Sequence, residues 1–256
     1  MSSRVIVVVP ARMASSRFPG KPLVEIAGLP MIEHVRRRAL LAEGIADVVV
    51  ATCDDEIAQA VERAGGKWVM TADNHERSTE RVAEAMGELE ADVVVVAQGD
   101  EPLLLPNDIE LVAHPLIEKA SVESVSLLSP LEGKDDFSNP NIVKAACDQS
   151  GHIMFYSRAP IPYVQKEGPC PIYRETGIRA FRVNFLHKYV ALPETPFEKV
   201  ESVDMMRLLE HGYSVVAAIT DGVTLGVDHA EEVERIERVL QIDAQQAALH
   251  ARIISG

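Results

Sequence analysis

The stretch that decides the fold is VIVVVPARMASSRFPGKPL, from Val5 to Leu23. Its first five residues are all β-branched and apolar, which predicts a strand buried on both faces, as in a parallel sheet. Pro10 is predicted to end this strand, and a loop follows. Ligands of open α/β sheets bind beyond the carboxyl ends of the strands, so this loop is the first candidate for a binding site.

Three cations, Arg12, Arg17 and Lys21, lie in this loop among small residues and a Pro-Gly turn. Small residues let backbone N–H groups approach phosphate oxygens, and cations offset their charge. The pattern therefore predicts a polyanionic ligand such as a nucleoside triphosphate. The alternative is a solvated basic loop, because Arg and Lys are common on protein surfaces.

Strand and helix patterns alternate after this loop. Apolar runs predict strands at 47–53, 67–70 and 92–97. Amphipathic stretches predict helices at 30–42, 54–64 and 106–119, and a loop followed by a helix within 74–90. This spacing is typical of βα units. It predicts an α/β fold with a mostly parallel, Rossmann-like sheet and helices on both faces.

The second half of the chain is less regular. The pattern predicts strands at 122–128, 177–182 and 214–219, a hairpin of 141–148 with 152–157, a Pro-rich loop from Ala159, and helices at 200–211 and 230–248. Gly151 lies in the turn of the hairpin, as short hairpin turns require. No repeat or linker separates a second unit, so we expect a single domain over residues 1–256.

Composition narrows the classes of function. The chain has 256 residues, a net charge of −14 and a pI near 5.0, which argues against nucleic acid or acidic membranes as partners. Its three cysteines form no disulfide or zinc pattern, and no apolar run approaches the roughly 18 residues of a membrane span. We expect a cytoplasmic protein.

Two acids follow predicted strands. Asp100, in the segment QGDEP after the strand 92–97, is preceded by a glycine that permits close approach, and Asp228 follows the strand-like Val223 to Val227. Carboxylates at the ends of two strands are suited to holding Mg²⁺ against phosphates. The alternative is that each acid only caps the helix after it.

Two further groups of polar residues stand out. In the segment NHERSTER, residues 74–81, Ser78 or Thr79 is suited to capping a helix and Arg81 to reaching a phosphate or a base. If 175–182 is extended, Glu175 and Arg179 share one face of the strand and can form a pair.

The motifs PARMASSRFPGKPL, QGDEP, NPNIVK, FYSR and a late GVD, in this order, resemble those of the 3-deoxy-manno-octulosonate cytidylyltransferases, or CMP-Kdo synthetases. The likeness covers Val5 to Leu240. Members of that family join a sugar acid to CMP from CTP and release pyrophosphate. The resemblance implies a cytoplasmic homodimer, with Mg²⁺ as cofactor and with about 130–200 forming the acceptor and dimerisation region, including a hairpin-containing insert.

The resemblance also implies roles for individual residues. Arg12, Arg17 and Lys21 would contact the triphosphate, Gln98 the cytosine or ribose, and Asp100 and Asp228 the metal. The implied CTP site is completed by Ala11, Ser78, Thr79 and Arg81. Within this set Arg12, Lys21 and Asp100 are the predicted catalytic residues.

Several positions depart from the family pattern, most of them on the acceptor side. The family's SGT-acid-Arg reads Arg77-Ser78-Thr79-Glu80-Arg81, with Ser in place of Gly. At the acceptor, His becomes Glu175, Tyr becomes Arg179, Glu becomes Asp204 and Gln becomes Met205, whereas Arg158 of FYSR is retained. Sites that hydrogen-bond a polar substrate discriminate strongly when those bonds are lost.

The changed residues therefore predict an acidic acceptor other than ordinary Kdo, either a modified sugar acid or a small phosphonate. Neutral drift in a working CMP-Kdo synthetase is the alternative. Two other classes are also considered, a glycosyltransferase that uses a ready-made sugar nucleotide and a nucleotide-binding module without catalysis. A diphosphate ligand would not need three loop cations.

Overall fold

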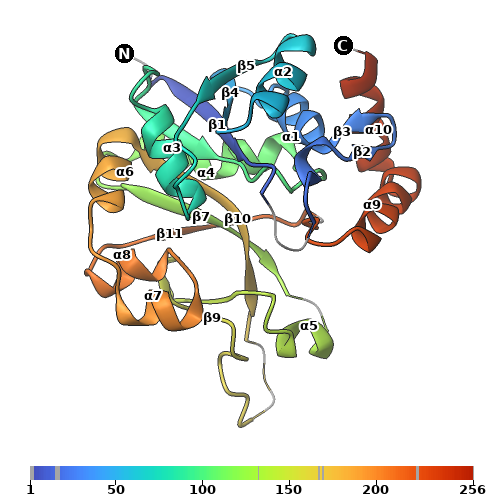
Figure 1. The fold of residues 1–256 in the computed structure, drawn as a ribbon. Helices are drawn as coiled ribbons and strands as arrows, with labels where there is room; N and C mark the ends of the chain where they lie inside the picture. The colour runs from blue at the N-terminus through green and yellow to red at the C-terminus, as the bar shows by residue number, and fades with distance from the viewer. Residues whose placement is uncertain are drawn as a thin grey trace.

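The computed structural model describes residues 3–14, 18–131, 133–166, 168, 170–222 and 225–255. Its main sheet runs in the order β11-β7-β10-β6-β1-β4-β5, and β8 and β9 form a hairpin that pairs with β10 (Figure 1). The strands of this sheet are β1 Val5–Ala11, β4 Ile45–Thr52, β5 Lys67–Met70, β6 Val93–Val96, β7 Ser124–Pro130, β8 Lys144–Cys147, β9 Ile153–Ser157, β10 Tyr173–Arg182 and β11 Val216–Ile219. Two short strands, β2 Glu25–Ile26 and β3 Leu29–Pro30, form a separate hairpin.

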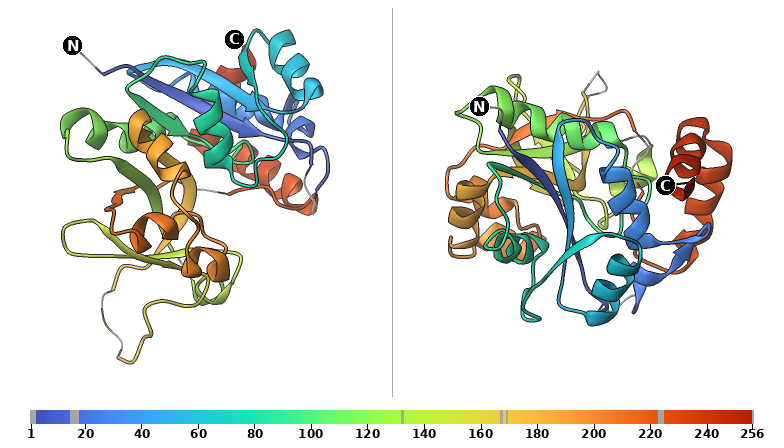
Figure 2. Two further views of the ribbon diagram at one scale, coloured as in Figure 1. Left: turned by 60° about the vertical axis from the view of Figure 1, so that its left-hand side comes forward. Right: turned by 90° about the horizontal axis from the view of Figure 1, so that it is seen from above.

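The helices cover both faces of the sheet (Figure 2). They are the 3-10 turn η1 Lys21–Leu23 and the α-helices α1 Met31–Ala39, α2 Asp55–Arg63, α3 Ser78–Ala85, α4 Pro106–Glu118, α5 Lys134–Ser138, α6 Val183–Val190, α7 Pro196–Glu201, α8 Met206–Glu210, α9 Glu231–Ile242 and α10 Ala244–Ser255. Within the described ranges, no helix combines the length and apolar composition needed to cross a membrane.

Strand β1 lies at the centre and all seven of its residues are buried. It pairs in parallel with β4 on one side and β6 on the other. Val5, Val7 and Val9 pack into a core with α1, α2 and α4, whereas Ile6 and Val8 pack into a second core with α3, α6 and α8. The predicted doubly covered, mostly parallel α/β sheet is confirmed, because among the strands of this path only β10 runs antiparallel to its neighbours.

The prediction that Pro10 ends the first strand was wrong. Pro10 pairs with Ala51 of β4, and β1 continues to Ala11. Strand β6 stops pairing at Val96, opposite Val8. On the β6 side, Pro10 therefore lies beyond the last paired residue, so its missing N–H interrupts no hydrogen-bond ladder there.

The predicted hairpin is confirmed, since β8 and β9 pair antiparallel around Gly151, whose φ is 82°. With α5 and the long loop after β9, it extends away from the sheet at the bottom of Figure 1.

Two predicted helices are each divided in two. The helix predicted at 200–211 is replaced by α7 and α8, because Ser202 is in the left-handed conformation, with φ 52°. The helix predicted at 230–248 breaks at Asp243, which is extended, so α9 and α10 form a pair. The spacing of apolar residues does not reveal a helix break that is one residue long. The strand-like stretch 223–227 lies partly outside the described residues, and 225–227 is not a strand.

The helix α10 returns to the N-terminal half and packs against α1. The rings of His34 and His250 stack with centroids 5.3 Å apart, and Arg38 is fully buried beside Gln246, to whose side-chain oxygen it donates at 2.6 Å. Burial, aided by the charges of Arg38, His250 and Arg37, lowers the pKa of His34 to about 4, although a hydrogen bond to Ile26 opposes this.

The pKa of His34 predicts a loss of stability in mild acid. The unfolded chain binds the proton below pH 6.5 and the folded chain only near pH 4, so the free energy of unfolding falls as the pH decreases between these values. A shift of this size corresponds to about 2 to 3 kcal/mol at pH 4.5. Urea unfolding at pH 7.5 and 4.5 measures it. His34→Gln should reduce the pH dependence, and His114→Gln, at an exposed position, should not. Equal pH dependence in both variants would contradict the prediction.

Candidate active site

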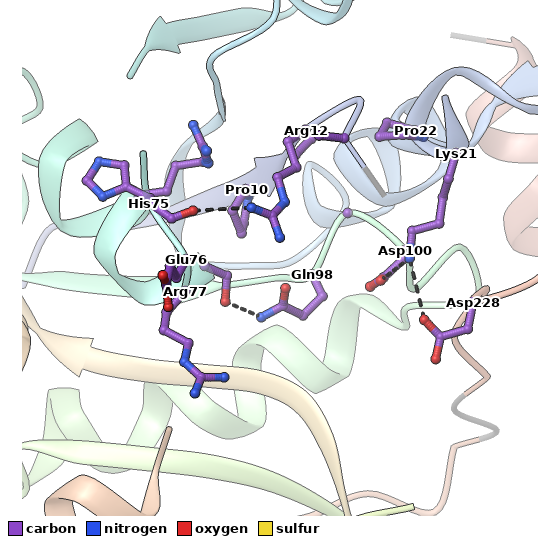
Figure 3. Close-up of a pocket in the computed structure, with 15 residues that line it drawn as sticks. Pro10, Arg12, Lys21, Pro22, His75, Glu76, Arg77, Gln98, Asp100 and Asp228 are labelled. Atoms are coloured by element: carbon purple, nitrogen blue, oxygen red, sulfur yellow. Dashed lines mark hydrogen bonds and ion pairs between the residues drawn. The ribbon is translucent and has the colours of Figure 1, made fainter. Parts of the chain in front are cut away.

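A cavity of about 330 Å³ opens where β1 and β6 end (Figure 3). Its walls include eight residues predicted for nucleotide or metal binding: Ala11, Arg12, Lys21, Ser78, Arg81, Gln98, Asp100 and Asp228. The sequence thus correctly predicted which distant segments meet. Arg17 lies outside the described residues.

Two carboxylates converge on one ammonium group in this cavity. Lys21 Nζ lies 2.6 Å from Asp100 Oδ2 and 3.7 Å from Asp228 Oδ1, and it also donates to the carbonyl of Val227 at 2.8 Å. The expected convergence of Asp100 and Asp228 is therefore present. Among the described residues no group of three or more acidic, His or Cys ligands occurs. Mg²⁺, however, typically binds one or two carboxylates together with substrate phosphates.

Close approach of two loops creates this geometry. A Cβ atom at Gly99 would lie 2.9 Å from the carbonyl oxygen of Pro10, a distance that real Cβ atoms essentially never show. The next residue, Asp100, accepts the backbone N–H of Val227 at 2.9 Å. Gly99 therefore lets the loop after β6 contact the end of β1 and places Asp100 beside Lys21.

A residue of another segment anchors the loop that follows β1. The backbone N–H of Met13 donates to Asp54 Oδ2 at 2.8 Å, at the start of α2. Arg12 is exposed, and its guanidinium donates to the carbonyl of His75 at 3.2 Å. The loop is thus held at its base while a cation remains presented to the cavity.

The start of α3 forms the wall opposite Lys21. Gln98 Nε2 donates to Ser78 Oγ at 2.9 Å, and Thr79 Oγ1 donates to Asp204 Oδ2 at 3.2 Å. Neither hydroxyl caps the helix as predicted, because helix α3 begins at Ser78 itself and Arg77 is the N-cap residue. Arg81 is buried, and its guanidinium donates to Thr71 and to the carbonyl of Ala72.

The predicted pair of Glu175 and Arg179 is confirmed. Arg179 Nε donates to Glu175 Oε1 at 2.8 Å across the irregular step at Gly177, and Arg179 Nη1 lies 2.8 Å from both oxygens of Asp204. Only 6% of Arg179 is exposed. Burial acts to raise the pKa of Asp204, but the charge and hydrogen bonds of Arg179 outweigh it and the pKa is lowered.

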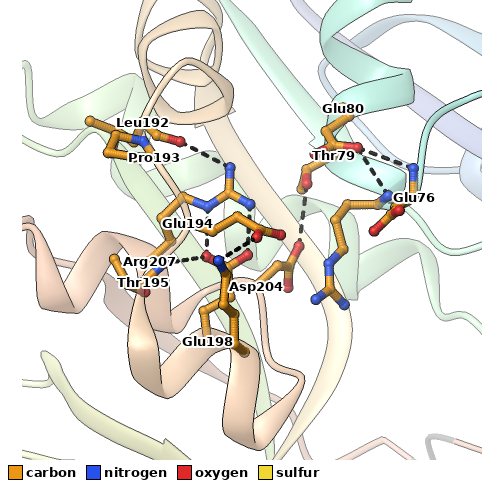
Figure 4. A network of polar contacts seen from close by, with 12 residues as sticks. Glu76, Thr79, Glu80, Leu192, Pro193, Glu194, Thr195, Glu198, Asp204 and Arg207 are labelled. Atoms are coloured by element: carbon orange, nitrogen blue, oxygen red, sulfur yellow. Dashed lines mark hydrogen bonds and ion pairs between the residues drawn. The ribbon is translucent and has the colours of Figure 1, made fainter.

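Asp204 lies in the break between α7 and α8, where it accepts the hydrogen bond from Thr79 (Figure 4). Arg207 holds the two helices together, donating to the two oxygens of Glu198 at 2.8 and 2.6 Å. Glu198 is fully buried. A buried bidentate pair of this kind fixes a segment in one geometry.

Two predicted acceptor residues have other environments. Met205 is fully buried in the apolar core formed with α6 and α8, so packing accounts for this side chain and we remove it from the acceptor set. Arg158 donates to the carbonyls of Pro140, Glu201 and Ser202 at 2.7 to 3.3 Å. Its guanidinium thus joins the FYSR and NPN segments to the end of α7.

Sequence reasoning missed three residues of the cavity wall and one acid next to it in the chain. His75, Glu76 and Arg77 line the cavity, and the segment NHERSTER was considered only for caps and for Arg81. Glu101 is flanked by Gly177 and Gly226, where added Cβ atoms would lie 4.0 and 3.4 Å from its Oε1. Burial and the charge of Asp100 raise the pKa of Glu101 to about 8, against the opposing charge of Arg174. The sequence signal that could have identified Glu101 was its position directly after Asp100.

The fold and the cavity at the strand ends are those of a nucleotidyltransferase. Residues 6–219 match the sequence profile of the family described as Cytidylyltransferase, and the chain belongs to that family and, within it, to the 3-deoxy-manno-octulosonate cytidylyltransferases.

Two relatives of that name illustrate the likeness. The protein of Acaryochloris marina is 40% identical over 93% of this chain and 97% of its own length. The Escherichia coli protein is 35% identical over 97% of this chain and 100% of its own.

Solved structures agree. A CMP:2-keto-3-deoxy-manno-octonic acid synthetase complexed with CTP superposes with a TM-score of 0.89, at 35% identity over 93% of this chain and 99% of that one. A 4-diphosphocytidyl-2C-methyl-D-erythritol synthase from Anaerococcus prevotii, with a TM-score of 0.61 and 15% identity over 93% of this chain and 99% of that one, shares the fold alone.

The close contact at Gly99 predicts that a larger residue there lowers both stability and nucleotide binding. Gly99→Ala should lower the free energy of unfolding by about 1 to 3 kcal/mol, because the methyl group overlaps the Pro10 carbonyl. It should also weaken nucleotide binding by displacing Asp100. Gly168→Ala is the control, since a Cβ there meets nothing within 4 Å. Thermal unfolding and nucleotide titration measure both effects, and a Gly99→Ala variant as stable as the control would show that the contact is not tight.

Proposed function

We propose that this enzyme transfers CMP from CTP to an acidic acceptor and releases pyrophosphate. The observation that carries the proposal is the meeting of Asp100, Asp228 and Lys21 at the strand ends, beside the exposed Arg12. The names of the relatives and the CTP in the superposed synthetase support it.

The cations of the first loop bind the triphosphate in this proposal. Arg12 and Lys21, with Arg17, contact phosphate oxygens, because guanidinium and ammonium groups form charge-assisted hydrogen bonds with them. Gln98, fixed by Ser78, contacts the cytosine or ribose. Ala11, Ser78 and Arg81 complete the wall, and the buried Thr79 supports it from behind.

Asp100 and Asp228 fit a divalent cation, which we take to be Mg²⁺. They approach a common point from separate segments, and Lys21 already supplies a positive charge there. When bound, the ion neutralises charge on the phosphates and polarises the reacting phosphoryl group.

The reaction is an in-line displacement. An acceptor oxygen forms a bond to the α-phosphorus of CTP, and the bond from that phosphorus to the bridging oxygen of pyrophosphate breaks. Lys21 and Arg12 stabilise the negative charge that spreads over the phosphoryl and leaving-group oxygens. The acceptor loses its hydroxyl proton to solvent or to a nearby base.

The acceptor in this proposal is an acid other than ordinary Kdo. At the positions where the family recognises its sugar acid, this chain has an ion-paired cluster of Glu175, Arg179 and Asp204. Arg179 already pairs with both carboxylates, which leaves fewer donors and acceptors for a polyhydroxylated substrate. A modified sugar acid or a small phosphonate fits this change, and ordinary Kdo is the alternative if the changes are neutral.

We also propose a single domain that forms a homodimer in the cytoplasm, with the region 130–200 as acceptor and dimerisation region. Apolar side chains gather on the protruding hairpin, its following loop and α7, where the exposed ones are Met154, Tyr163, Val164, Phe197 and Val200. Exposed apolar groups of this kind are typical of association surfaces. The charge of −14 fits a protein that does not bind nucleic acid.

Asp100→Asn tests the chemistry. If Asp100 holds the metal, pyrophosphate release from CTP should fall on the order of 10²-fold or more while the fold is retained. Asp73→Asn, at an exposed position, should match the parent. Release is measured for each nucleoside triphosphate with a panel of acids. An unchanged rate at saturating Mg²⁺ would remove the metal role, and folded enzyme that binds CTP but never turns it over would favour a binding module.

Arg179→Tyr combined with Glu175→His tests the acceptor side. We expect a lower activity with the native acceptor and a nearly unchanged affinity for CTP, because neither residue lines the nucleotide cavity. Stability should fall by about 3 kcal/mol, since buried Asp204 loses its ion-pair partner. Measurements of acceptor KM, CTP affinity and thermal unfolding separate these effects. A parent that uses Kdo as well as any other acid, with a variant that changes nothing, would establish neutral drift.

A further inference from the structure

We infer that Arg77 binds the anionic group of the acceptor and determines which acids are accepted. This inference rests on the proposed function and assigns the cation that the acceptor site needs. In the sequence, Arg77 is the first residue of RSTER, the segment that corresponds to the SGT-acid-Arg motif.

Arg179 cannot serve this purpose without disrupting the core. Its Nε and Nη1 atoms already donate to Glu175 and Asp204 at 2.8 Å, and little of its surface is exposed. An incoming acid would have to displace buried carboxylates from a guanidinium, which leaves those charges unpaired at high cost. The acceptor's charge is therefore held elsewhere.

Arg77 has the position and the unpartnered donor that Arg179 lacks. It lines the same cavity as Gln98 and Asp100, and in Figure 3 its side chain points away from Arg12 and the phosphate-binding loop. Its Nε atom is buried and has no hydrogen-bond partner within the described part of the chain. A buried donor without a partner is costly, and a bound oxygen would satisfy it.

Arg77 interacts electrostatically with the acceptor cluster, which is the trio of Glu175, Arg179 and Asp204. Glu175, Arg179 and Asp204 comprise two carboxylates and one guanidinium, so one negative charge remains uncompensated within the trio. After burial and Arg179, the charge of Arg77 also acts on the pKa of Asp204 and helps to lower it. Arg77 therefore lies between the nucleotide cavity and the residues that replaced the family's acceptor contacts.

The chemistry of a guanidinium defines the class of acceptor. Its planar fork of donors matches carboxylates, phosphonates and phosphates in a bidentate way. Because the long side chain occupies space at the rim of the cavity, the site favours an acid smaller than an eight-carbon sugar acid. Its nucleophilic oxygen would lie towards Asp100 and its anionic group towards Arg77.

A simpler reading is that Arg77 only neutralises Asp204. The two readings differ in what the loss of Arg77 does. Pure neutralisation predicts a less stable protein with unchanged acceptor affinity, whereas direct contact predicts weaker acceptor binding. An acceptor titration together with an unfolding measurement therefore separates them.

The experiment uses the full-length protein saturated with Mg²⁺ and the α,β-methylene analogue of CTP, which cannot react. Kdo, a smaller 2-keto sugar acid and phosphonoacetate are titrated by calorimetry onto the parent and onto Arg77→Ser, Arg77→Lys and Arg63→Ser. Arg63 is exposed at the end of α2 and is the matched Arg-to-Ser control. Affinity for the CTP analogue and thermal unfolding are measured for each variant.

Arg77→Ser should weaken binding of the smaller acids about 10- to 100-fold, the range expected when a charge-assisted hydrogen bond is lost. It should leave affinity for the analogue within about twofold, and Arg77→Lys should restore only part of the loss because lysine lacks the fork. Arg63→Ser should match the parent.

Equal acid affinities in Arg77→Ser and the parent, or no acid binding to the parent at all, would overturn the inference. A failure of the proposed function looks different, because it is an absence of pyrophosphate release from unmodified CTP with every acid.

Discussion

Like charges at one end of the sheet are the constraint on which the site depends. Asp100 and Asp228 come from segments 128 residues apart and approach a single point, which is unfavourable without a cation between them. Lys21 supplies that cation from the opposite loop. The three groups together fix the end of β1, the loop after β6 and the segment before α9, so the geometry of the cavity follows from one electrostatic requirement.

A second group of paired charges lies on the other side of Gln98. Arg179 is held between Glu175 and Asp204, and Asp204 reaches it only because the chain turns at Ser202 between two short helices. Gly177, with φ 85° and a would-be Cβ 3.0 Å from Gln98 Cγ, lets β10 pass directly beneath the glutamine. One strand therefore joins the cavity wall to the cluster of Glu175, Arg179 and Asp204, and a change in that cluster need not disturb the loop after β1.

Local patterns were sufficient to predict the sheet and the meeting of Arg12, Lys21, Asp100 and Asp228 at the strand ends. The run Val5–Val9, the cations after it and the acid after β6 are each readable within a few residues, and parallel strands bring their ends together automatically. The four departures from the family pattern on the acceptor side were also visible in the sequence, but the arrangement of their side chains was not. Whether Arg179 faces a ligand or a carboxylate depends on a left-handed residue at Ser202, and nothing in the periodicity of 200–211 indicates one. Arg77 was overlooked for a related reason, since a charge beside a helix start is ordinary until Asp204 is placed near it.

The contact between Lys21 and the segment at 227–228 has a consequence for synthesis. Its two partners are separated by 206 residues along the chain. On the ribosome, where N-terminal strands emerge and pair first, the loop after β1 therefore remains without its partners at 227–228 until that segment has been synthesised. A nascent chain that ends before residue 227 lacks this contact, whatever the rest of the sheet has formed.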